Sequence, residues 1–227
     1  MKTKKQTAFT LIELLTVIAI IGTLSAILIP VIGSMRHSAD SSKSVSNLRQ
    51  IGNAVLVYTS SHGGAFPFLN RPANNPDADS QYFWPQALEE SVFGWDRATQ
   101  GKHPVFVDPT ALSSHGISDY GGSTYIFLDA NGANPNRAEN TLSVNSLEDP
   151  SRTLVVCTSY AENSGKASWY VQGDFGRGGS PVNIPEARLN QQEIGVVFAD
   201  GHVELIEKSQ MYDDLEYRRS IFDVIAN

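Results

Sequence analysis

The stretch FTLIELLTVIAIIGTLSAILIPVIG occupies residues 9–33 and carries a single charge, Glu13. Each Leu, Ile, Val or Phe in such a run favours insertion into a bilayer by about 0.3–0.6 kcal/mol. One carboxylate at mid-membrane would cost about 2.5–3.5 kcal/mol. Insertion is therefore favoured in spite of the charge. Residues 14–35 contain no charge and are long enough to span a bilayer as a helix. The sequence predicts one N-terminal membrane helix, in which Glu13 needs a separate explanation.

Three interpretations of this segment follow from its flanks. The basic opening MKTKK favours a cytoplasmic N-terminus under the positive-inside rule. A secretory signal peptide would have a shorter core and a better cleavage site than HSA at residues 37–39. A permanent anchor leaves Glu13 without a role. In the third interpretation, the chain is cut before the apolar run, which stays in the mature protein.

The third interpretation comes from a resemblance. Residues 4–13, KKQTAFTLIE, resemble the type III signal of type IV pilins and type II secretion pseudopilins. In that family, prepilin peptidase cuts before the Phe and methylates the new amino terminus. The resemblance implies cleavage between Ala8 and Phe9, with Ala8 where the family usually has Gly, and N-methylation of Phe9. Pro30 falls where many members carry a helix-kinking proline.

The same resemblance implies a role in assembly for Glu13. In the family, this carboxylate pairs with the Phe9 amine of a neighbouring subunit. A lone carboxylate and a lone amine are both costly in lipid, and pairing offsets that cost. The charge would then set the register between subunits, and identical or related pilin-like subunits would be the partners.

A second half of the same helix is predicted from periodicity. Apolar residues recur at steps of three or four through residues 45–58, as in a helix with one face on a core. Residues 38–44 are polar on all sides, which predicts an exposed stretch. The sequence predicts four regions: a leader (1–8), a membrane or filament-core helix (9–33), its amphipathic continuation (34–62) and a globular domain (63–227).

The globular domain is predicted to be small and α+β. It places a long N-terminal helix on an antiparallel sheet with a C-terminal hairpin. The hairpin comes from apolar runs on either side of Asp200 and Gly201, a strong turn signal. The other predicted elements are an exposed loop at 70–80, a helix at 85–92, strands at 103–109, 120–128 and 153–158, a polar loop at 129–140 and a glycine-rich loop at 173–179.

Two further segments resemble a pseudopilin-like family of planctomycete and verrucomicrobial type. They are SNLRQIGNAVLVYTSSHGGAFP at residues 46–67 and the region from Arg188 to the hairpin. Members commonly carry Arg-His-Asn before the Asp-Gly turn, whereas this chain has Arg-Leu-Asn at 188–190. Where members often have Cys-Pro, this chain has Asp108 followed by Pro109.

No local motif predicts catalysis or a cofactor. The formal net charge of −7 argues against nucleic-acid binding, which favours a basic surface. The single cysteine, Cys157, lies in an apolar stretch and is predicted to be buried and inert. His202 and Glu204 share a strand face, but a metal site would need further ligands.

A weak calcium candidate lies in residues 129–134, where Asp129, Asn131 and Asn134 supply oxygen atoms. No bidentate Glu follows at the distance that calcium loops use. The chemistry of a turn explains the same composition.

The prediction is therefore a structural subunit of a pseudopilus or type IV pilus-like filament that serves type II secretion. It would sit in the cytoplasmic membrane with its domain in the periplasm, and the assembly machinery would be a partner. The alternative is a membrane-tethered binding module that does not polymerise. A third class, an enzyme on an anchor, has no supporting motif.

Overall fold

The computed structural model describes residues 11–68, 70–71, 82–127, 142–161, 165–168, 170–171, 183–190 and 192–222. The chain forms two compact units, Met1–Ala39 and Asp40–Asn227. Helix α1 (Leu11–Ser61) contributes to both. The predicted loops at 129–140 and 173–179 fall outside the described residues.

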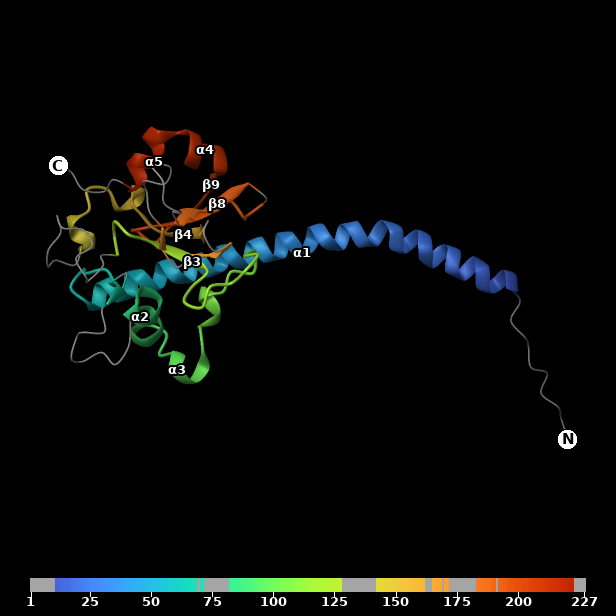
Figure 1. Ribbon diagram of the computed structural model, residues 1–227, viewed down its shortest axis with the longest axis horizontal. Helices are drawn as coiled ribbons and strands as arrows, with labels where there is room; N and C mark the ends of the chain where they lie inside the picture. Colours follow the sequence, from blue (N-terminus) through green and yellow to red (C-terminus); the bar gives the residue numbers. More distant parts are fainter. Residues whose placement is uncertain are drawn as a thin grey trace. The chain divides into compact units, whose positions relative to one another are not determined.

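The second unit contains a sheet and short helices (Figure 1). Its sheet runs in the order β6 (Tyr170–Val171), β3 (Tyr120–Ser123), β4 (Leu154–Ala161), β8 (Glu193–Phe198) and β9 (Val203–Glu207), with β5 (Lys166–Ala167) and β7 (Asn183–Pro185) also paired to β4. A separate pair joins β1 (Asn70–Arg71) and β2 (Tyr82–Phe83). The helices are α2 (Trp84–Ser91), α3 (Arg97–Gln100), α4 (Lys208–Asp213), α5 (Leu215–Phe222) and the 3-10 turns η1 (Pro104–Phe106), η2 (Val144–Ser146) and η3 (Pro150–Arg152).

The two faces of the sheet carry separate apolar clusters. Along β8, Val197 joins the cluster that contains Leu48 and Ile51 of α1. Its neighbours Val196 and Phe198 join the other cluster, which includes Met211 of α4 and Phe222 of α5. Side chains alternate between the faces of a strand, so one strand serves both cores. Within this unit, Figure 1 shows α4 and α5 on one side of the sheet and the C-terminal part of α1 on the other.

The predicted α+β fold class is confirmed, with one difference in the sheet. A long N-terminal helix precedes a sheet that ends in an antiparallel hairpin of β8 and β9. The pairing between β3 and β6 is parallel, so the sheet is mixed rather than wholly antiparallel. The predicted helix at 85–92 is α2, and the predicted strand at 153–158 is β4, which continues to Ala161.

Two predicted strands are wrong in kind or in length. Within 103–109 there is no strand, and Pro104–Phe106 form the 3-10 turn η1, because Pro104 opens it and His103 Nδ1 accepts the N–H of Val105. The segment 120–128 is a strand only as far as Ser123. The carbonyl of Ser123 accepts the N–H groups of Ile126 and Phe127, which turns the chain. Within the predicted loop at 70–80, Asn70–Arg71 pairs as β1.

The hairpin closes through three residues, Ala199, Asp200 and Gly201. The Gly201 N–H donates to the Phe198 carbonyl, and the Phe198 N–H donates to the His202 carbonyl. Gly201 has φ +89°, while Asp200 is not among the described residues with positive φ. This combination is the type I turn followed by a left-handed glycine, a common three-residue hairpin loop.

Close packing at Gly122 predicts a stability effect. A Cβ at this position would overlap the Phe127 ring and lie 2.9 Å from Trp84 Nε1. Both rings are fully buried, so neither can move aside freely. Gly122→Ala is expected to lower the free energy of unfolding by about 1–3 kcal/mol. Urea unfolding of the full chain in detergent micelles, followed by tryptophan fluorescence, measures this change.

A matched control is available at Gly116, where nothing lies within 4 Å of an added Cβ and φ is not positive. Gly116→Ala is expected to change the stability by less than about 0.5 kcal/mol. Equal effects of the two substitutions would contradict the packing argument.

Candidate functional site

The N-terminal part of α1 presents a run of exposed apolar side chains. Those from Leu11 to Met35 are 45–81% exposed, Val17 being the least and Leu11 the most exposed of the large ones. This part of α1 is long and apolar enough to cross a membrane. Such a surface is unfavourable in water and favourable in lipid or against other apolar helices.

Three hydroxyl groups of this segment are satisfied locally. The hydroxyls of Thr16, Thr23 and Ser34 each donate to the carbonyl three residues earlier, at 2.9–3.0 Å. Hydrogen bonds of this kind allow Ser and Thr to lie within lipid, where no water is present to satisfy them. The segment is therefore suited to an apolar environment in its polar as well as its apolar side chains.

Glu13 lies in the first turn of α1, and Pro30 lies inside the helix. A carboxylate near the N-terminus of a helix is favoured by the helix dipole. Pro30 has no N–H to donate to the carbonyl of Ala26, yet α1 continues through it. Ala8 and Phe9 fall outside the described residues, so the cleavage prediction stays a prediction.

The predicted calcium residues Asp129, Asn131 and Asn134 also lie outside the described residues. Within the described ranges, no group of three or more His, Cys, Asp and Glu side chains could hold a metal ion. His202 instead stacks on Phe198, and its Nδ1 lies 2.6 Å from Asp200 Oδ1.

The segment Asn-Leu-Arg-Gln-Ile-Gly at 47–52 packs α1 against the rest of the second unit. Leu48 and Ile51 are fully buried. Gly52 permits close approach, because an added Cβ would lie 3.0 Å from the Gly201 carbonyl oxygen. Asn47 is 1% exposed, and its Nδ2 donates to the Val107 carbonyl at 2.9 Å.

The prediction that residues 38–44 are exposed is wrong at Ser41 and Ser44, which are buried. Ser44 Oγ lies 3.2 Å from the hydroxyl of Tyr120 in β3. Ser41 Oγ accepts the N–H of Asn190. Burial raises the pKa of Tyr120 well above its ordinary value, so the phenol stays neutral. Ser41 and Ser44 therefore contact the domain, while Ser38, Ser42 and Lys43 are exposed as predicted.

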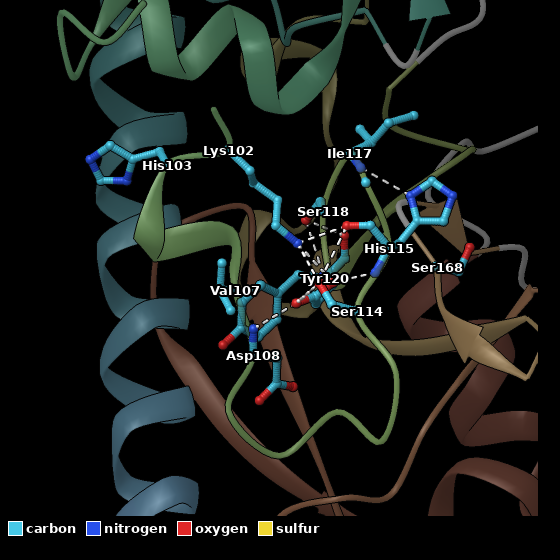
Figure 2. A network of polar contacts seen from close by, with 12 residues as sticks. Lys102, His103, Val107, Asp108, Ser114, His115, Ile117, Ser118, Tyr120 and Ser168 are labelled. Atoms are coloured by element: carbon cyan, nitrogen blue, oxygen red, sulfur yellow. Dashed lines mark hydrogen bonds and ion pairs between the residues drawn. The ribbon is translucent and has the colours of Figure 1, made fainter. Parts of the chain in front are cut away.

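A long connection in the domain, residues 102–119 (the 102–119 segment), is held by a buried carboxylate. The side chain of Asp119 has no exposed surface. It accepts hydrogen bonds from Lys102 Nζ at 2.9 Å, from Ser114 Oγ at 2.8 Å, and from the N–H groups of His115 at 2.7 Å and Asp108 at 3.1 Å. Figure 2 shows Lys102 and Ser114 meeting in this network. Asp119, at the end of the segment, thus binds Lys102 at its start.

A second buried ion pair joins this segment to the sheet region. Arg188 Nη2 lies 3.0 Å from Asp108 Oδ2 and donates to the Asp119 carbonyl at 3.1 Å. Arg188 Nε lies 3.2 Å from Glu186 Oε2, an ion-pair contact rather than a directed hydrogen bond. Burial raises the pKa of Glu186, and the nearby Arg188 opposes that shift.

A third pair fixes α2 to α3. Glu89 is 1% exposed and accepts from Arg97 Nε at 2.5 Å and Arg97 Nη2 at 2.7 Å, as well as from the His103 N–H. Arg97 Nη2 also donates to the Ile117 carbonyl at 2.9 Å. These pairs hold the elements of the domain together, and Glu89 and Arg97 also line a cavity beside Trp95.

Comparison with known proteins bears on the N-terminus. A family model described as the prokaryotic N-terminal methylation motif matches residues 3–29. This chain carries that methylation motif. The matched range includes Glu13 and the predicted cleavage position, and it ends one residue before Pro30.

The chain is also similar to core protein G of the type II secretion system. It is 29% identical to the Aeromonas hydrophila protein over 87 residues, 35% of this chain and 61% of that protein. It is 39% identical to the Escherichia coli K12 protein over 56 residues, 25% of this chain and 39% of that protein. The chain thus spans less than two thirds of the length of either relative. No solved structure matches it.

Proposed function

We propose that this chain is a pseudopilin-type subunit that assembles into a filament through α1. The observation that carries the proposal is the methylation motif at residues 3–29, which overlaps the part of α1 whose large apolar side chains, from Leu11 to Met35, are exposed. The similarity to core protein G of the type II secretion system supports the choice of a secretion pseudopilus over other filaments.

In this proposal the chain is inserted in the cytoplasmic membrane with its domain in the periplasm. Prepilin peptidase cuts between Ala8 and Phe9 and methylates Phe9. The mature helix then leaves the lipid and packs against the same segment of identical or related subunits. Leaving lipid forfeits its apolar contacts, and helix packing replaces them. The secretion machinery drives this step, and the subunit itself catalyses no reaction.

Glu13 sets the register in this assembly. Its carboxylate lies in the first turn of α1, four positions after Phe9 in the sequence. In an apolar filament core, an ion pair with the Phe9 amine of a neighbour offsets the desolvation of both charges. The paired state exists only when two helices are correctly aligned, so the charge discriminates against other alignments.

The second candidate is a tethered module that binds a ligand and does not polymerise. The exposed apolar helix is compatible with it, since an anchor needs the same surface. The two candidates differ in what happens to the N-terminus. An anchor needs neither cleavage before Phe9 nor a methylated amine.

The intact mass of the protein, extracted from the membrane of its native host, tests the proposal. The expected mass lacks residues 1–8 and includes one additional methyl group. Fragmentation of the N-terminal peptide should place that methyl on the Phe9 amine. A full-length chain with an unmodified N-terminus would refute processing, and the tethered module would then be the better explanation.

A further inference from the structure

Two histidines in the 102–119 segment accept hydrogen bonds from the backbone. His103 Nδ1 accepts the Val105 N–H at 3.1 Å, and His115 Nδ1 accepts the Ile117 N–H at 3.1 Å. An imidazole nitrogen can accept only while it carries no proton, because both nitrogens of the imidazolium are donors. Both turns therefore require neutral rings.

His115 lies where two of the buried ion pairs meet. Its N–H donates to Asp119 Oδ1 at 2.7 Å, and its carbonyl accepts from Lys102 Nζ at 2.7 Å. The turn that its ring closes ends at Ile117, whose carbonyl accepts from Arg97 Nη2. Figure 2 shows the ring of His115 directed to Ile117 while its backbone borders the network around Lys102. Opening this turn would displace the carbonyl groups that accept hydrogen bonds from Lys102 and Arg97.

The charges around His115 disfavour an imidazolium. Lys102 and Lys166 of β5 repel a positive ring, and Asp119 attracts it. The Asp119 carboxylate is already occupied by an ammonium, a hydroxyl and two backbone N–H groups. Burial, with Lys102 next in importance, lowers the pKa of His115.

His103 differs in the charge that faces it. Burial among Phe93, Trp95 and Phe106 lowers its pKa, but Glu89 stabilises its protonated form. The Glu89 carboxylate would compensate in part for the lost Val105 hydrogen bond. The repulsive surroundings make His115 the more sensitive of the two.

We propose that His115 makes the 102–119 segment acid-sensitive: protonation of its Nδ1 breaks the turn to Ile117 and loosens the segment from α3. The resulting change of stability with pH has one sign. Above the ordinary imidazole pKa of about 6.5, the folded and unfolded chains both hold a neutral ring, and the turn is intact. As the pH falls through that value, the unfolded chain takes up a proton more readily than the folded one. Stability is therefore lost on acidification.

The substitution His115→Asn separates the titration from the hydrogen bond. Asn Oδ1 can accept the N–H two residues ahead, as in an Asx turn, and it does not titrate. The full chain is unfolded with urea in detergent micelles at pH 7.5 and pH 5.0. The unfolding constant of the unmodified chain is expected to rise about fivefold more over this interval than that of His115→Asn. A fivefold ratio corresponds to about 1 kcal/mol, which is the net contribution of one hydrogen bond to stability.

His62 supplies the matched control. Its Nδ1 lies 2.8 Å from the Tyr58 carbonyl, a contact that a protonated ring can still make by donating. His62→Asn should therefore keep the pH dependence of the unmodified chain. Equal pH dependence of His115→Asn and the unmodified chain would overturn the proposal.

A second measurement does not depend on the folding of a variant. The histidine ring resonances of the unmodified chain are titrated by NMR, with His115 assigned through its contact to the Ile117 amide. A His115 ring that titrates below 6.5, together with loss of the Ile117 contact as it titrates, would support the proposal. Titration at or above 6.5, or an Ile117 contact that survives protonation, would refute it.

Discussion

Replacing Glu13 with Ala is expected to leave the chain inserted in the membrane and processed, but unable to form filaments. The substitution removes a carboxylate from an apolar segment, so insertion becomes easier. In the proposed assembly it leaves the Phe9 amine of a neighbour without its counter-charge. Removal of one partner from a buried ion pair costs about 3–5 kcal/mol. Association of each subunit would then weaken by a factor of about 100 or more.

The measurement compares sheared or overexpressed filaments, quantified by immunoblotting and electron microscopy, with the processed protein in the membrane. Leu14→Ala is the matched control, since Leu14 is the adjacent exposed residue of the same helix and carries no charge. It should assemble far better than Glu13→Ala. Filaments of Glu13→Ala at the normal level would contradict the assembly role and would favour a tethered module.

Replacing Arg188 with Met is expected to lower the free energy of unfolding by about 3–5 kcal/mol, the cost of breaking a buried ion pair on one side. Arg188 has a side chain that is 5% exposed, and it contacts Asp108, which has no exposed side-chain surface. Met fills much of the volume but leaves Asp108 and Glu186 without their shared cation. Urea unfolding of the full chain in micelles at pH 7.5 measures the loss.

Two controls locate the cause of that loss. Arg49→Met changes an exposed arginine of α1 and should alter stability by less than about 0.5 kcal/mol. The double substitution of Arg188→Met with Asp108→Asn removes the stranded charge. It should cost less than the sum of the two single substitutions. Additive costs would show that Arg188 contributes by packing and not through its charge.

Local patterns in the sequence were sufficient for the elements that local interactions determine. The apolar run and the steps of three and four residues indicated α1, because helix faces follow directly from spacing. Apolar residues around Asp200 and Gly201 indicated the hairpin, since only a few turn types can join two such strands. The loop itself has three residues instead of two.

Another group of errors concerns residues whose surroundings come from distant parts of the chain. Ser41 and Ser44 looked exposed because their neighbours in sequence are polar, yet Asn190 and Tyr120 cover them. The buried pair of Asp108 and Arg188 had no local signal. In the sequence, Asp108 departs from the Cys-Pro of the related family and Arg188 matches its Arg-His-Asn, and nothing local connects the two. Their contact depends on the fold of the whole domain.

At the N-terminal site, too, the sequence predicts the local features and not the contacts with distant groups. Glu13 and Pro30 could be placed from sequence because they lie in one helix with a recognisable motif. In the proposed filament the partner of Glu13 would belong to another subunit, which the fold of a single chain does not contain.

The burial of Cys157 has a practical consequence for labelling. It is the single cysteine of the chain, it lies fully buried in β4, and burial raises the pKa of its thiol. Maleimides and spin labels react with an accessible thiolate, so this residue gives little background in the folded protein. Leu112 is 94% exposed, so a cysteine introduced there by Leu112→Cys would react with a probe while Cys157 would not. The native sequence thus permits site-specific crosslinking and distance measurements between subunits without prior removal of its own thiol.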